Sequence, residues 1–291
     1  VKQTVAADEF SRLQELRKVV AAAGLDSHPA CQEVPHSRRA ATLLRYLRAR
    51  KTVEQSSKMF REALDWRRDF DLEAKLQKWR KEWHAGTSPR AKLLRTYGYT
   101  ACIGLDHEGL PVHLHRTSQC DAGGLVRELG QEVFVLHHLL KLEDCFAAAQ
   151  EQMLKSGKLI TNFVDIYDQG DYGLVPGWLR RGYAAFPPYK EMVPILDKVY
   201  PERLRVAFIC RCPMAFAAFW RLVTPLLPEA TVKKIRIKGY PANSWLAEMK
   251  EFVPEKTIPE FLRSDDRSLL KAAEPWGGIV PEGSLALMEQ R

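Results

Sequence analysis

The sequence predicts an α/β protein in which a helical N-terminal lobe precedes a lobe with a mixed, mainly parallel sheet. Residues 1–95 indicate successive helices, whereas short β-branched runs alternate with longer helical stretches in residues 96–262. Strands that alternate with helices of about ten residues or more are typical of a sheet with crossover helices. Apolar residues make up 46% of the 291-residue chain, which is enough for a substantial core.

The N-terminal region should form compact helices joined by short loops. Asp8 can cap a first helix that runs to about Ala23, and Gly24 can end it. Leucines at 43, 44 and 47 repeat at helical spacing in a later helix, and residues 53–66 carry the apolar face of another.

After residue 96 the pattern predicts strands and crossover helices. Residues 100–106 and 108–115 suggest two strands joined by an Asp106-x-x-Gly109 turn. A helix is expected over residues 128–155. Further strands are expected over residues 159–166, 204–210 and 235–238. Residues 263–291 carry few signals, so we interpret them as a C-terminal tail that wraps the body or is partly loose.

The chain is basic, with a net charge of +8 and a pI near 9.2. Ten Lys and Arg face three Asp and Glu between residues 38 and 68, and more basic residues fall in 233–238. These segments could be solvated surfaces or footprints on an anionic membrane, where each basic side chain contributes about 1 kcal/mol. No nucleic-acid-binding motif is present, so no nucleic-acid partner is expected.

The six cysteines contain no C-x-x-C pair, and the start of the chain does not resemble a signal peptide. A cytoplasmic protein with reduced thiols is expected. The longest apolar run is the nine residues 212–220, well below the roughly 20 of a membrane span, so membrane contact should be peripheral.

Common nucleophile, metalloprotease, P-loop and dinucleotide motifs are missing from the sequence, so we do not expect an enzyme. The acidic run Asp165, Asp168 and Asp171 lacks the glycine and distal glutamate of a calcium loop. We interpret it as a turn at a strand end, and no metal site is expected.

Six segments together resemble the CRAL-TRIO family, and in particular its yeast-type phosphatidylinositol/phosphatidylcholine transfer proteins. They are Leu43-Leu-Arg-Tyr-Leu-Arg-Ala-Arg-Lys51, Ala63-Leu-Asp-Trp-Arg-Arg68, Asp106-x-x-Gly109-Leu-Pro-Val112, Tyr200-Pro-Glu-Arg-Leu204, Thr231-Val-Lys-Lys-Ile235 and Ile258-Pro-Glu-Phe261. The resemblance implies a sheet that floors an apolar pocket, and a mobile gate helix over residues 215–227. Gate residues that could touch lipid are Phe216, Phe219, Trp220, Leu222 and Val223; an ordinary buried helix is the alternative.

The resemblance also implies a phosphoinositol headgroup site. Its residues would be Arg50, Lys51, Glu202, Arg203, Thr231 and Lys234. Cations and a hydroxyl suit a phosphodiester, and a carboxylate can accept from inositol hydroxyls. A plain salt bridge at Glu202 and Arg203, and a solvated basic strand edge at Lys234, are the alternatives.

Cys102, His113 and His115 stand where the family has phosphocholine-binding residues, so they are candidates for a changed pocket wall. His113 and His115 alternate and should point to one face of a strand. They could ligate a metal or haem, or lie on an exposed face.

The sequence therefore predicts a monomeric carrier that takes a phospholipid, phosphatidylinositol above all, from an anionic membrane without a cofactor. One alternative is a carrier of a sterol, a retinoid-like or tocopherol-like molecule, or haem. Another is a membrane-recruited sensor that presents its lipid to a lipid kinase.

Overall fold

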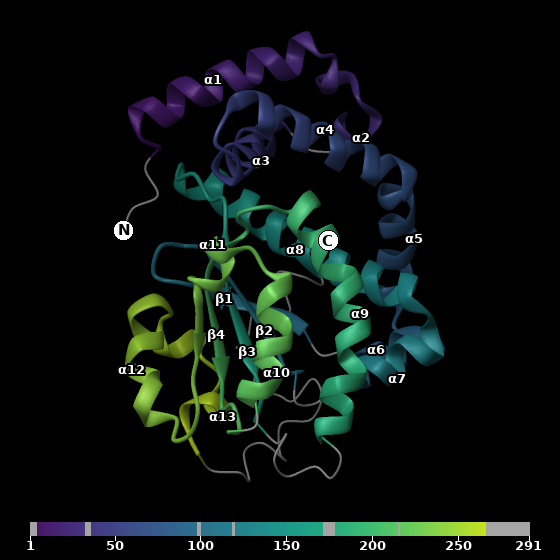
Figure 1. Ribbon diagram of the computed structural model, residues 1–291, viewed down its shortest axis with the longest axis vertical. Helices are drawn as coiled ribbons and strands as arrows, with labels where there is room; N and C mark the ends of the chain where they lie inside the picture. Colours follow the sequence, from purple (N-terminus) through teal and green to yellow (C-terminus); the bar gives the residue numbers. More distant parts are fainter. Residues whose placement is uncertain are drawn as a thin grey trace.

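The computed structural model has the predicted fold class, with N-terminal helices above an α/β lobe (Figure 1). The structure describes residues 5–32, 36–97, 100–117, 120–170, 178–214 and 216–265. Most of the expected C-terminal tail lies outside these residues.

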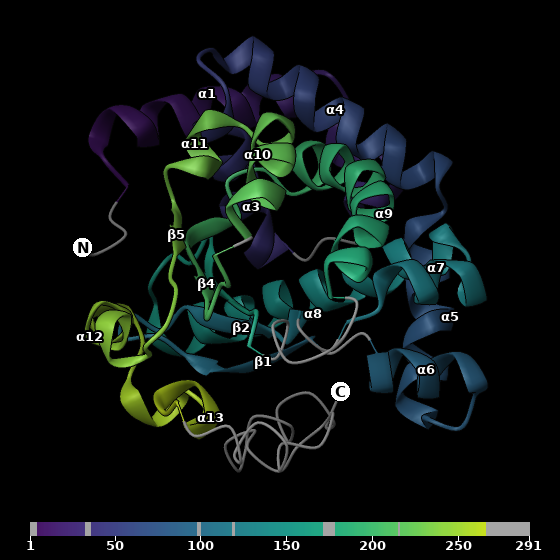
Figure 2. The same ribbon diagram turned by 60° about the horizontal axis from the view of Figure 1, so that its bottom comes forward.

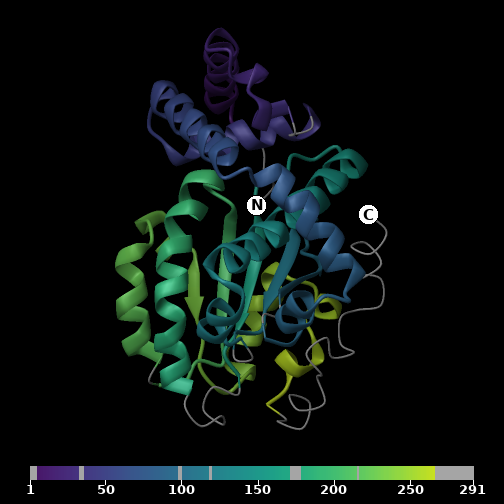
Figure 3. The same ribbon diagram turned by 90° about the vertical axis from the view of Figure 1, so that its right-hand side faces the viewer.

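The N-terminal helices contribute to two apolar cores. Their bounds are α1 Ala7–Ala22, η1 Leu25–Ser27, α2 Pro29–Gln32, α3 His36–Ala49, α4 Val53–Asp69, α5 Leu72–Ala85 and α6 Pro89–Tyr97. Gly24, with φ 68°, follows α1 as predicted, because glycine enters the left-handed region without a Cβ penalty. The Tyr46 hydroxyl of α3 donates to the carbonyl of Val199 at 2.8 Å and so ties this lobe to the α/β lobe. Helices α1 to α4 form a core of their own and appear in Figure 3 as a layer above the α/β lobe, whereas α5 and α6 pack against that lobe.

The α/β lobe is built on a five-stranded sheet in the order β1-β2-β3-β4-β5. The strands are β1 Thr100–Leu105, β2 Pro111–His115, β3 Phe163–Asp168, β4 Leu204–Cys210 and β5 Ile235–Ile237. β1 and β2 pair antiparallel, and the other neighbours pair in parallel. The predicted Asp106 turn is present, since its Oδ1 accepts from the backbone N–H groups of Glu108 and Leu110, both at 2.8 Å.

The prediction for the third strand was partly wrong. β3 begins at Phe163, later than expected, and extends through Asp168, so Asp165 lies in its middle and Asp168 belongs to the strand rather than to a turn after it. Their charges are paired inside the protein: Arg203 donates to Asp165 at 2.9 Å, and Arg211 donates to Asp168 at 2.6 Å. Burial of a carboxylate is tolerated where such a partner is present.

Crossover helices connect the parallel strands. They are α7 Ala122–Leu129 and α8 Gln131–Ser156 after β2, α9 Trp178–Val199 after β3, and α10 Phe216–Val223, η3 Thr224–Leu226 and α11 Glu229–Val232 after β4. α9 contains three prolines, Pro187, Pro188 and Pro194. The chain then continues through α12 Asn243–Phe252, η4 Glu255–Thr257 and α13 Glu260–Arg263.

The two faces of the sheet are covered by different helices. In Figure 2, α12 and α13 lie on one side of the strands, and α8, α9 and α10 lie on the other. On the first side, which we call the solid face, strand residues pack against α12 and α13 in one buried cluster. Its strand residues are Ala101, Ile103, Val112, Leu114, Val164, Ile166, Val206, Phe208 and Cys210. Trp245 and Phe261 complete this cluster from the helices.

Candidate functional site

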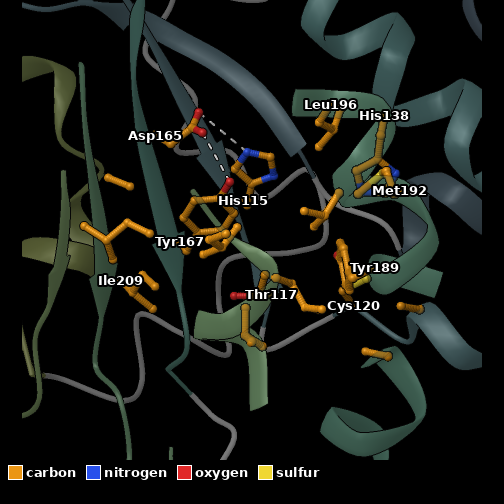
Figure 4. A pocket seen from close by; sticks show the side chains of 18 of the residues that line it. His115, Thr117, Cys120, His138, Asp165, Tyr167, Tyr189, Met192, Leu196 and Ile209 are labelled. Atoms are coloured by element: carbon orange, nitrogen blue, oxygen red, sulfur yellow. Dashed lines mark hydrogen bonds and ion pairs between the residues drawn. The ribbon is translucent and has the colours of Figure 1, made fainter. Parts of the chain in front are cut away.

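The opposite face of the sheet lines a cavity of about 260 Å³. We call it the cavity face; its strand residues are Thr100, His113, His115, Asp165, Tyr167, Leu204, Ala207, Ile209 and Ile235. The far walls come from α9, α10 and the segment after α10, and Figure 4 shows Tyr189, Met192 and Leu196 of α9 across the space from His115 and Tyr167. Most of the exposed lining is apolar, and the polar groups gather on β2 and β3.

The expected gate helix forms one wall of this cavity. Phe216, Phe219, Trp220 and Val223 all line it, because spacings of three and four residues place them on one face of α10. Leu222 points outward and is 43% exposed. The structure thus brings four of the five predicted gate residues to the cavity and leaves Leu222 on the solvent side.

Four predicted headgroup residues converge at a smaller cavity of about 80 Å³ beside the first. Glu202, Arg203, Thr231 and Lys234 all line it, and Arg203 and Thr231 line the larger cavity as well. Lys234 Nζ lies 2.6 Å from Glu202 Oε2. Glu202 has φ 49°, a left-handed conformation that is strained for a residue with a side chain. Such strain is found mainly at functional positions.

Arg50 and Lys51 lie elsewhere. Both are exposed between α3 and α4, and neither is among the described residues that line the two cavities. Arg50 donates to the carbonyl of its neighbour Ala49 at 2.8 Å. The basic pair is therefore on the helical lobe and outside the cavity rim in this conformation.

His113 and His115 face the cavity, so the alternative of an exposed strand face was wrong. His113 is only 1% exposed, and the residue that pairs with it in register on the neighbouring strand β3 is Asp165. Asp165 Oδ1 lies 3.5 Å from His113 Nδ1 and 3.8 Å from His115 Nε2. On the outer side of the rings, Thr100 Oγ1 lies 2.6 Å from His113 Nε2 and 3.2 Å from His115 Nδ1.

Burial sets the protonation of this cluster. It lowers the pKa of His113 and brings the pKa of His115 to about 4, although Asp165 acts in the opposite direction on both. Burial by itself would raise the pKa of Asp165, but Arg203 and the two imidazoles hold it well below its usual range. At neutral pH the cluster therefore holds two uncharged imidazoles beside a charged carboxylate.

Cys102 does not belong to the cavity wall. Its side chain is on the same side of the sheet but packs against the core cluster that includes Cys145 of α8, and it is not among the described lining residues. Cys102 lies farther along β1 than Thr100, which does line the cavity, and at that point the strand is covered by Cys145 and its neighbours on α8.

Two charged cavity residues were missed by sequence reasoning. The acidic run that contains Asp165 was interpreted only as a turn at the strand end, and the pairing of β2 with β3 is what places Asp165 beside His113. Lys141 of α8 also lines the cavity, and burial brings its pKa down to about 8. Its position in the apolar run 139–142 was a signal that a lysine is buried.

None of the helices that the structure describes has both the length and the apolar character to cross a bilayer. This finding fits the short apolar runs seen in the sequence.

Comparison with known proteins places the chain in a family. The model of the CRAL/TRIO domain matches residues 95–263. A CRAL-TRIO domain-containing protein of Caenorhabditis elegans, T23G5.2, is 27% identical over 252 residues, covering 86% of this chain and 33% of that protein. The phosphatidylinositol/phosphatidylcholine transfer protein SFH9 of Arabidopsis thaliana is 25% identical over 230 residues, covering 76% and 36%.

A solved structure shares the fold. The crystal structure of Sfh5 superposes with a TM-score of 0.60 at 16% identity, and the match covers 99% of this chain and 98% of that chain. The chain spans about a third of the length of the curated relatives it matches. With the matched domain covering more than half of its residues, the protein belongs to the CRAL/TRIO domain family of lipid-binding and lipid-transfer proteins.

Proposed function

We propose that the protein binds phosphatidylinositol and transfers it between membranes or presents it there, without catalysing a reaction. The observation that carries the proposal is that an apolar cavity and a cavity with polar lining lie next to each other and share lining residues. An apolar space suits acyl chains, and a neighbouring space lined by Arg203, Thr231, Lys234 and Glu202 suits a phosphoinositol headgroup. Lys234 and Thr231 offer donors to a phosphate, and Glu202 offers an acceptor to ring hydroxyls.

The size of the apolar cavity requires a moving wall. At about 260 Å³ it is smaller than the roughly 300–1,000 Å³ of sites for drug-sized ligands, and a lipid with two acyl chains is larger still. Outward movement of α10 would enlarge the space and give it access to a bilayer. Each methylene buried there contributes roughly 0.8 kcal/mol, which balances its loss from the membrane and permits exchange.

Delivery to an anionic membrane, in the cytoplasm, would use basic surface residues. Arg50 and Lys51 are exposed and available for such a surface. In this proposal they act during docking, and the converging residues near Lys234 select the lipid.

The test compares two neighbouring lysines. Lys234→Ala should reduce transfer of phosphatidylinositol between donor and acceptor vesicles by about 10- to 100-fold, because a hydrogen bond to a charged group is worth about 1.5–3 kcal/mol. Lys233→Ala is the matched control, since Lys233 is 73% exposed and pairs with Glu229 on the outside. Equal transfer by both variants would remove Lys234 from the headgroup site.

A second candidate is a carrier of a more compact hydrophobe, such as a sterol, a tocopherol-like molecule or haem. The small cavity volume favours it, as does the polar cluster on its floor. Native mass spectrometry of the purified chain with extraction of the bound molecule separates the two candidates. A co-purifying phospholipid supports the first, and a single-tailed or polycyclic molecule supports the second.

A further inference from the structure

Three buried polar atoms on the cavity face have no hydrogen-bond partner among the described residues. They are His113 Nδ1, His115 Nε2 and Asp165 Oδ1. The three residues come from two adjacent strands, and they present ligand atoms within 4.8 Å of one another. Figure 4 shows Asp165 and His115 side by side at one end of the cavity.

The hydrogen bonds on the outer side of the rings determine what the inner atoms can be. Thr100 Oγ1 is within hydrogen-bond distance of one nitrogen on each imidazole. A hydroxyl has one proton, so it can donate to only one of the two rings. The other ring must donate its own N–H to Thr100, and an uncharged imidazole has only one N–H.

At least one inner nitrogen is therefore a bare lone pair directed at the carboxylate. Two acceptors that face each other away from water leave both unsatisfied, which is costly. The other oxygen of Asp165 is already engaged, since it accepts from Arg203 at 2.9 Å and from the Tyr167 hydroxyl at 3.2 Å. A hydroxyl oxygen can also accept from both rings, and both inner nitrogens are then lone pairs. In that arrangement three acceptors face one another without a donor, and a cation between them would satisfy all three.

We propose that His113, His115 and Asp165 form a binding site for a divalent transition-metal ion such as Zn²⁺. Two imidazoles and one carboxylate are a ligand set used for such ions, whereas Mg²⁺ and Ca²⁺ prefer oxygen ligands alone. Bonds of about 2.0–2.1 Å put neighbouring ligand atoms about 3.3 Å apart in a tetrahedron. The separations of 3.5 and 3.8 Å from Asp165 would close by a few tenths of an ångström on binding.

The surroundings resemble the supporting groups of metal sites. Thr100 fixes the orientation of both rings from behind, and Arg203 with Tyr167 fixes the carboxylate. Three protein ligands leave at least one coordination position, and all three residues line the cavity. That position would take water or an oxygen atom of the cavity's occupant. This last step alone rests on the proposed lipid function.

The test uses the full chain, stripped of metal with a chelator and titrated with Co²⁺ and then Zn²⁺ in the absence of lipid. We expect one Co²⁺ per chain with visible ligand-field absorption, which Zn²⁺ then displaces. His115→Gln should weaken binding at least 100-fold, and Thr100→Val should weaken it about 10- to 100-fold through loss of ring orientation. His107→Gln removes an imidazole on a surface loop and should bind as the unaltered chain does.

X-ray absorption of the Zn²⁺-loaded, unaltered chain provides a readout that needs no variant. Two imidazole ligands with oxygen support the site, whereas sulfur ligands would place the metal on the cysteines and overturn it. A folded chain that shows no saturable binding, or binding that His115→Gln leaves unchanged, also overturns it. Because lipid is left out, these results are independent of the phosphatidylinositol transfer assay.

Discussion

The two faces of the sheet differ in packing: one is filled with apolar side chains, and the other lines a cavity. Val112 and Leu114 of β2 are at most 1% exposed and pack on the solid face, while the alternating His113 and His115 point to the cavity. On the solid face, Trp245 and the strand residues fill the space between the sheet and α12. A single strand therefore supplies stability with one set of residues and a ligand site with the other, which separates the two requirements in a testable way.

The largest effect should come from the solid face. Trp245→Ala should lower the free energy of unfolding by about 3–5 kcal/mol, because Trp245 is 1% exposed and nothing nearby can fill its volume. Trp220→Ala should cost about 1 kcal/mol or less, because Trp220 is only partly buried and lines the cavity, with its ring stacked on Phe216 of the same helix. Urea unfolding of both variants measures the difference; equal losses would mean that the two faces are packed alike.

The second effect is a pH dependence of stability that comes from a histidine on the cavity side. Burial lowers the pKa of His138, which lines the cavity, from 6.5 to about 4, although its contact with the Phe134 carbonyl opposes the shift. Between those values the unfolded chain takes up the proton first, so this residue's contribution to stability is lost as pH falls from about 6.5 toward 4.

His138→Gln should therefore flatten the pH dependence of unfolding. The slope removed is at most about 1.4 kcal/mol per pH unit. Urea unfolding at about pH 7 and about pH 5 measures it. The unaltered chain should lose more stability than the variant between about pH 7 and about pH 5. Equal losses would contradict the lowered pKa of His138.

A third variant tests the outer side of the cavity wall. Leu222→Asp adds a charge at an exposed position, so stability should change by no more than about 0.5 kcal/mol. Exchange of lipid with vesicles should nevertheless slow down, because the outer face of α10 would meet the membrane when the wall opens. Stopped-flow transfer of a fluorescent lipid gives the rate, and an unchanged rate would argue against contact at Leu222.

The smallest effect should come from the basic pair outside the cavity. Replacement of Arg50 and Lys51 by alanine should weaken binding to anionic vesicles by about 1 kcal/mol per residue and leave the transferred lipid unchanged. Vesicle sedimentation at low and high salt measures this. If the double variant alters lipid selection at equal membrane binding, the pair belongs to the headgroup site after all.

Much of the fold could be predicted because it follows from local patterns. β4 was predicted with its observed bounds, since Leu204–Cys210 is a short apolar run between turn residues. β3 was expected over residues 159–166 rather than 163–168, because the acidic run with Asp165 and Asp168 was interpreted as the turn at the strand end. Their partners Arg203 and Arg211 lie far along the chain, and no local pattern reveals them.

The candidate site was predictable only in parts. The alternation of side chains along a strand correctly placed His113 and His115 on one face of the sheet. It could not show which face lines the cavity. The acidic member of the cluster depends on the register that sets His113 opposite Asp165. The position of Cys102 was equally unpredictable, because it depends on the helix that covers that part of β1.

The prolines of α9 give one wall of the cavity unusual compliance. Proline has no N–H, so Pro187, Pro188 and Pro194 each omit a hydrogen bond that would otherwise hold one turn of the helix to the next. Bending this wall away from the sheet breaks fewer bonds than bending an ordinary helix would. The space that receives a guest can thus grow by flexing along α9 as well as by displacing α10, and its volume at rest is a lower limit on what it can hold.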